Sequence, residues 1–271
     1  MISYIINRKT PLFWLIFHVV LGALSTLTPW VLIIWFYLVL MTSVFNLFRS
    51  TENSFVPLIY LITYATSFEL LARMSGTSPY MPYELGKYLL FVLLIFGFLK
   101  GFRKVLIGWV MVVLLLPGLL IDEAGQTTLK NIIFNLIGPV NVALAVVFFK
   151  KQEVTKEEFF NLLRLLLYPL LAVLAFTIIK SPALDKIEFT LNANFATAGG
   201  FGTNQVSTAL GLGAFVTFLF WWNRMKMTGF LWLDILIFIG FVFRGLLTFS
   251  RGGMFGVALG ILTVLIFSQR Q

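Results

Sequence analysis

The chain has 271 residues, of which 59% are hydrophobic and 11% charged, and its formal net charge is +9. A soluble domain carries about 25% charged residues, and a disordered chain combines low hydrophobicity with high net charge, so the composition excludes both classes. Because the mean hydropathy is also +0.96, we expect an all-α, polytopic membrane protein. Residues 1–271 would then form a single transmembrane helical bundle in a lipid bilayer.

Ten apolar segments predict membrane spans along the chain. The hydrocarbon core of a bilayer is about 30 Å thick, and crossing it takes about 20 apolar residues in a helix. Pro29 separates the first two segments, since proline is favoured at the start of a helix. The predicted spans are 11–27, 29–48, 55–72, 87–99, 105–121, 131–149, 159–179, 204–222, 230–248 and 252–267.

The distribution of basic residues predicts the orientation of these spans. If the N-terminus lies inside, the inner segments contain twelve of the 20 Lys and Arg residues, and the outer segments and outer helix ends contain six. Cytoplasmic loops of membrane proteins accumulate Lys and Arg, so both termini are predicted to be cytoplasmic. This explanation of the basic excess requires no nucleic acid as a partner.

Ionisable residues within the predicted spans need partners, because charge is costly in a bilayer. Arg164 and Asp234 lie at similar depth and could pair, although Arg164 could instead extend to the lipid headgroups. Glu69 and Arg73 are four residues apart, which favours an ion pair on one helix face. For His18, the single histidine, we expect packing or an interhelical hydrogen bond.

Two arginines near the predicted outer surface are candidates for binding a diphosphate. Arg244 and Arg251 are seven residues apart and would share a helix face if the ninth helix continued that far. Ser250 is a candidate N-cap for the tenth helix, and Gly252 leaves the N–H groups of that helix accessible to an anion. The alternative is an interfacial arginine that binds a lipid headgroup at a tight turn.

The segment 198–205 (AGGFGTNQ) precedes the eighth predicted helix. The side-chain amides of Asn204 and Gln205 could bind a glycan, and a simple capped turn is the alternative. The chain contains no cysteine, no metal-ligand pattern and no phosphate-binding loop. We therefore expect no metal or cofactor, and we assign no catalytic residue.

The sequence between 195 and 267 resembles the O-antigen ligase/polymerase superfamily. The segment 246–253 (LLTFSRGG) resembles the Ser-Arg-Gly signature of that family, and 201–205 (FGTNQ) resembles its Asn-rich segment, in the matching order. Upstream of residue 195, the agreement is limited to the many-helix hydropathy.

This resemblance implies a metal-independent, inverting membrane glycosyltransferase at the periplasmic face of the bacterial inner membrane. Such enzymes transfer a glycan from undecaprenyl diphosphate to an acceptor, which is lipid A–core or another glycan. The resemblance implies that Arg251 binds the donor diphosphate, whereas Arg244 is added from its helical spacing.

One departure from the family keeps other functions open. The large outer loop with a functional histidine that follows the Ser-Arg-Gly segment in ligases is absent, so we expect an N-terminal portion of a ligase or a short divergent member. A transporter or flippase for a lipid-linked or anionic substrate is one alternative, because Pro117, Pro139 and Pro169 could mark broken helices. A non-catalytic membrane subunit is another.

Overall fold

The computed structural model of the chain describes residues 11–49, 55–82, 85–99, 106–115, 117, 129–150, 153–187 and 193–268. Within these ranges the fold is helical and contains no strand, which confirms the predicted all-α class. The α-helices are α2 (Pro11–Leu24), α3 (Trp30–Arg49), α4 (Val56–Ser75), α5 (Leu85–Leu99), α6 (Leu106–Leu115), α7 (Leu129–Phe149), α8 (Lys156–Lys180), α9 (Thr203–Trp222), α10 (Leu231–Leu247) and α11 (Arg251–Phe267), with a short 3₁₀ turn η2 (Leu184–Lys186).

Each predicted span overlaps one of these α-helices, and the boundaries differ by a few residues. Four of them are long and apolar enough to cross a membrane: Trp30–Phe48 in α3, Asn131–Phe149 in α7, Lys156–Lys180 in α8 and Thr203–Trp222 in α9. These helices indicate a membrane protein, whereas ten crossings and cytoplasmic termini stay predictions. Most of the inner basic residues lie outside the described ranges.

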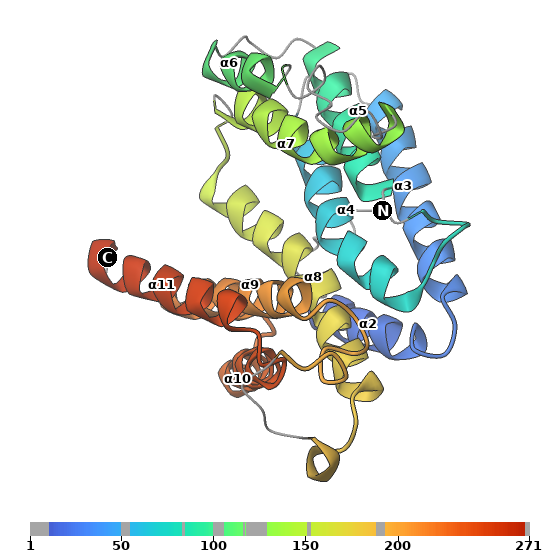
Figure 1. The fold of residues 1–271 in the computed structure, drawn as a ribbon. Coiled ribbons are helices and arrows are strands. Elements are labelled where there is room, and N and C mark those ends of the chain that lie inside the picture. Colours follow the sequence, from blue (N-terminus) through green and yellow to red (C-terminus); the bar gives the residue numbers. More distant parts are fainter. Residues whose placement is uncertain are drawn as a thin grey trace.

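The helices do not all run along one axis. Figure 1 shows α9 and α11 side by side, with α10 seen end-on next to them, whereas α3 and α4 run in another direction. The proline-containing helices α7 and α8 continue through Pro139 and Pro169. These two prolines therefore do not produce the broken helices that the transporter hypothesis invoked.

Helix α8 occupies the centre of the fold, where α2, α4 and α9 pack against it. The helix begins with a capping box, in which Thr155 and Glu158 each accept a hydrogen bond from the other's backbone N–H. Further along, α2 crosses α8 so closely that a β-carbon on Gly22 would collide with the backbone of Ala172. This contact requires glycine at position 22 for steric reasons.

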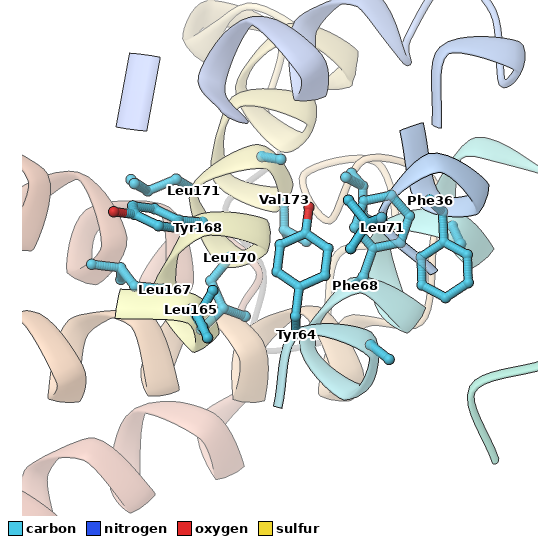
Figure 2. Packing of buried hydrophobic residues seen from close by; sticks show 14 of the residues in the cluster. Phe36, Tyr64, Phe68, Leu71, Leu165, Leu167, Tyr168, Leu170, Leu171 and Val173 are labelled. Atoms are coloured by element: carbon cyan, nitrogen blue, oxygen red, sulfur yellow. The ribbon is translucent and has the colours of Figure 1, made fainter. Parts of the chain in front are cut away.

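Aromatic side chains fill the space between α3 and α4. Figure 2 shows Tyr64 and Phe68 of α4 beside Phe36 of α3, and the rings of Phe36 and Phe68 stack with centroids 5.2 Å apart. Stacked aromatic pairs contribute about 0.5–1.5 kcal/mol beyond the burial of their surface. The aromatic residues thus fix the spacing of these two helices.

The hydroxyl of Tyr64 joins three helices within this aromatic core. It lies 2.9 Å from Nε2 of His18 on α2 and accepts a hydrogen bond of 2.6 Å from Nε1 of Trp35 on α3. Nδ1 of His18 lies 2.7 Å from the carbonyl oxygen of Trp14. Since a carbonyl only accepts, Nδ1 carries the proton and Tyr64 donates to Nε2. The interhelical role expected for His18 is therefore confirmed.

Replacing Tyr64 with phenylalanine should destabilise the protein. Tyr64→Phe leaves a buried imidazole nitrogen and a buried indole N–H without partners, at a cost of about 1–3 kcal/mol for each lost partner. The matched control is Tyr37→Phe, which removes an exposed hydrogen bond to the carbonyl of Tyr80 and should change stability by less than about 0.5 kcal/mol. Thermal unfolding of both variants in the same detergent tests this prediction, and equal midpoints would contradict it.

Candidate functional site

The junction between α10 and α11 carries the Ser-Arg-Gly segment. Helix α10 ends at Leu247, Phe249 adopts a left-handed backbone conformation with φ of 54°, and α11 begins at Arg251. The condition under which Arg244 and Arg251 would share one helix face is therefore not met, because the chain turns at Phe249 and the two arginines lie on separate helices.

Ser250 connects this junction to α9. Its hydroxyl donates a hydrogen bond of 2.6 Å to Oδ1 of Asn204, and its carbonyl accepts one of 2.9 Å from the hydroxyl of Ser207. Ser250 is the N-cap residue of α11, as predicted, but its side chain does not cap the helix. The two segments that carry the family resemblance therefore meet at the N-termini of α9 and α11.

Helices α9 and α11 approach each other closely along a line of small residues. A β-carbon on Gly253 would collide with the backbone of Ser207, and one on Gly211 would crowd the carbonyl of Gly253. The neighbouring Gly252, in contrast, faces open space. The second glycine of the segment is thus required for packing, while the first leaves room beside the start of α11.

Arg244 is buried, with 6% of its surface exposed. Its Nη2 donates hydrogen bonds of 2.7 Å to the carbonyl of Thr177 at the end of α8 and of 2.9 Å to the carbonyl of Thr197. Among the described residues, no carboxylate forms an ion pair with Arg244. Arg244 therefore joins three segments through backbone oxygens, and its predicted contact with a diphosphate stays a prediction.

Arg251 has a different environment, because its side chain is exposed at the first position of α11. It borders a cleft of about 400 Å³ between α10 and α11, in which it is the one charged group among the lining residues described. The cleft is lined by Leu246, Phe249, Ser250, Arg251, Met254, Phe255 and Ala258. Such a combination of one arginine with an apolar wall suits an amphiphilic anion.

The structure separates the two amides predicted to bind a glycan. Asn204 contacts Ser250 beside the Arg251 cleft, whereas Gln205 lines a second cleft of about 410 Å³ between α4, α8 and α9. Glu69 and Arg73 also line this second cleft, and their charged atoms lie 3.6 Å apart. The predicted ion pair is confirmed, but its position beside Gln205 was not predicted, since no local pattern relates α4 to α9.

Arg164 and Asp234 do not pair as considered above. Nη1 of Arg164 donates to Oδ1 of Asn161 at 2.9 Å. The Asp234 carboxylate instead accepts hydrogen bonds from the backbone N–H groups of Met227 and Thr228 and from the Thr228 hydroxyl. Asp234 thus organises the turn that precedes α10.

Within the described part of the chain, no group of three or more His, Cys, Asp or Glu side chains is arranged to hold a metal ion. No family model matches the chain, and comparisons with curated proteins and with solved structures found no match either. The chemistry of the site therefore has to be argued from its own residues.

Replacing each of the two adjacent glycines of α11 with alanine should change the stability of the protein by different amounts. Gly253→Ala forces apart the backbones of α9 and α11, and overpacking of this kind costs about 1–3 kcal/mol. Gly252→Ala meets open space and should leave stability within about 0.5 kcal/mol. Unfolding midpoints of the two variants measure this difference, and a greater loss in Gly252→Ala would refute the packing assignment.

The two arginines should likewise differ in their contribution to stability. Arg244→Ala removes two hydrogen bonds that a buried guanidinium donates to the carbonyls of Thr177 and Thr197. Ser181 still donates to both carbonyls, so the expected cost is that of the lost charge-assisted hydrogen bonds, about 1.5–3 kcal/mol. Arg251→Ala removes an exposed side chain and should cost less than about 0.5 kcal/mol. Denaturation of both purified variants tests the prediction, which fails if Arg251→Ala is the less stable of the two.

Proposed function

We propose that the chain is a membrane glycosyltransferase of the O-antigen ligase/polymerase type. It transfers a glycan from undecaprenyl diphosphate to a lipid or glycan acceptor at the periplasmic face of the bacterial inner membrane. The observation that supports this proposal most directly is the hydrogen bond between Asn204 and Ser250. It joins the two family-like segments beside the exposed Arg251 and the cleft that this residue borders.

The donor diphosphate binds at the start of α11. The guanidinium of Arg251 offers paired donors to phosphate oxygens. The N-terminus of α11 adds backbone N–H groups and the positive end of the helix dipole. The side chain of the N-cap residue Ser250 does not bind these N–H groups. Gly252 lets the phosphate approach, because the space beside it is open.

The apolar wall of the same cleft holds the prenyl chain of the donor. Leu246 and Phe255 lie on it and are exposed by 57% and 63%, and burying such side chains against a lipid chain contributes about 25 cal/mol per Å² of apolar area. Arg244 has a supporting role, since it holds the turn around Thr197 against α10.

Positive charge at this position favours departure of the diphosphate. The oxygen of the acceptor hydroxyl forms a new bond to the anomeric carbon of the donor sugar, and the bond between that carbon and the diphosphate oxygen breaks. The electron pair stays on the diphosphate, where Arg251 stabilises the developing charge, and the hydroxyl proton passes to solvent. Attack from the opposite side of the ring inverts the anomeric centre.

Replacing Arg251 should weaken binding of the donor lipid. In lipid nanodiscs, Arg251→Ala should raise the Kd for undecaprenyl diphosphate about tenfold or more, because a hydrogen bond to a charged group contributes about 1.5–3 kcal/mol. Arg251→Lys should retain part of the affinity, since it keeps the charge but loses the paired geometry. The control Lys226→Ala removes an exposed charge from the turn before α10 and should leave the Kd within about twofold.

A second measurement separates glycan transfer from binding or transport. Cells that depend on the protein should lose their surface glycan when Arg251→Ala replaces the wild type, as seen in glycan profiles on gels. Unchanged profiles would reject the enzymatic proposal. Movement of the prenyl diphosphate across proteoliposomes without glycan transfer would support a flippase instead.

A further inference from the structure

An apolar pocket lies between α9 and α10, next to the turn that joins these two helices. It has a volume of about 280 Å³ and is lined by Thr217, Phe218, Trp221, Asp234, Ile235 and Phe238. Two of these residues, Trp221 and Ile235, are exposed by 49% and 45%, so the pocket is open at the surface of the protein. We call it the α9/α10 pocket.

The hydroxyl and the carboxylate on the lining of this pocket have partners inside the protein. The hydroxyl of Thr217 donates a hydrogen bond of 2.8 Å to the carbonyl of Gly213. The carboxylate of Asp234 accepts hydrogen bonds from the backbone N–H groups of Met227 and Thr228 and from the Thr228 hydroxyl. Asp234 also lies in the first turn of α10, where the helix dipole favours a negative charge. The pocket therefore offers a ligand mainly apolar surface, which suits a hydrocarbon chain.

Two cations lie in the turn at the end of this pocket. Arg224 and Lys226 are exposed, and they lie in the chain between Trp221 and Asp234, which both line the pocket. The N–H of Arg224 donates to the carbonyl of Trp221 at 2.9 Å, and Asp234 binds the N–H of the residue after Lys226, so both ends of the turn are fixed to the pocket. The segment 223–233 contains no acidic residue. Positive charge is thus concentrated beside an apolar pocket.

The position of this turn matches the interface between a membrane and water. Helix α9 has 20 residues and is therefore about 30 Å long, which is the thickness of the hydrocarbon core. It ends with Trp221 and Trp222, and Trp232 in the first turn of α10 is exposed by 66%. Tryptophan is enriched at membrane interfaces. Under the predicted orientation, this end of α9 faces the cytoplasm, where the adjoining leaflet carries anionic lipids.

We propose that the α9/α10 pocket and its basic turn bind an anionic phospholipid, such as phosphatidylglycerol. Arg224 binds the phosphate of the headgroup through paired donors, and Lys226 binds it as a point charge. One acyl chain of the lipid lies in the pocket against Phe218 and Ile235. The site is at the opposite end of α9 from Arg251, and it does not depend on the proposed glycosyltransferase function.

Photolabelling in lipid nanodiscs locates the bound lipid along the chain. The probe is phosphatidylglycerol with a diazirine in one acyl chain, and zwitterionic phosphatidylcholine with the same chain is the control probe. Each cation beside an anionic lipid contributes about fivefold in affinity, so phosphatidylglycerol should label residues 217–238 at least about fivefold more than phosphatidylcholine does. Equal labelling of this segment by the two probes, or the same preference at every exposed helix, would overturn the proposal.

Charge variants test whether the two cations bind the headgroup. The double variant Arg224→Asn with Lys226→Gln should lower phosphatidylglycerol labelling of residues 217–238 at least about fivefold and leave phosphatidylcholine labelling within about twofold. Asparagine tolerates the φ of 55° at position 224. The matched control, Lys180→Gln with Lys186→Gln, removes two other exposed positive charges and should leave both signals within about twofold. Equal losses in the two double variants would mean that only the net charge of the protein attracts the lipid, and would refute the site.

Filling variants test whether an acyl chain lies in the pocket. Ile235→Trp fills the pocket and should reduce phosphatidylglycerol labelling of α9 about tenfold, because excluding two methylenes of the chain has an effect of this size. The control Leu236→Trp changes the neighbouring exposed residue, which is not among those lining the pocket, and should leave labelling within about twofold. Unfolding midpoints verify that both variants are folded. A folded Ile235→Trp variant with full labelling would contradict the binding of a chain in the pocket.

A soluble competitor separates a site for a lipid from a site for free phosphate. Glycerol 3-phosphate has a charged phosphate without an acyl chain, so it gains nothing from the apolar pocket. At millimolar concentration it should leave phosphatidylglycerol labelling within about twofold. If it abolishes the labelling, the turn binds free phosphate, and the assignment to a phospholipid is wrong.

Discussion

The burial of α8 between α2, α4 and α9 is the packing on which the rest of the described structure depends. A helix surrounded in this way must be apolar on most of its surface, and 72% of the α8 window is buried. Its neighbours must also come close, as α2 does where Gly22 crosses Ala172. Because interiors are close-packed, the position of α8 determines where α4 and α9 can lie, and hence the groove between them.

Polar side chains complete this packing by satisfying backbone groups at helix ends and turns. Arg244 binds the carbonyls of Thr177 and Thr197, and Asp234 binds the backbone N–H groups before α10. Unpaired backbone groups are costly in an apolar environment. Among the described residues, the buried Arg244 and Asp234 thus hold turns, whereas Arg251 is exposed at the start of α11.

Helix α9 relates the two clefts to each other. Its N-terminus meets that of α11 through Asn204 and Ser250, while Gln205 and Thr208 line the groove toward α4. The close contact at Gly253 prevents α11 from moving relative to α9 without losing packing.

The sequence by itself determined the helices and the contacts within them. Hydropathy placed a predicted span over each α-helix of the described residues, and the spacing of Glu69 and Arg73 predicted their ion pair. Both features depend on residues a few positions apart. The tertiary structure decided that Arg244 turns inward and that Asn204 meets Ser250. It also decided that Gln205 lines a different cleft from Asn204. Such contacts join segments that are distant in the chain. They depend on how whole helices pack against one another, and no local sequence pattern encodes that packing.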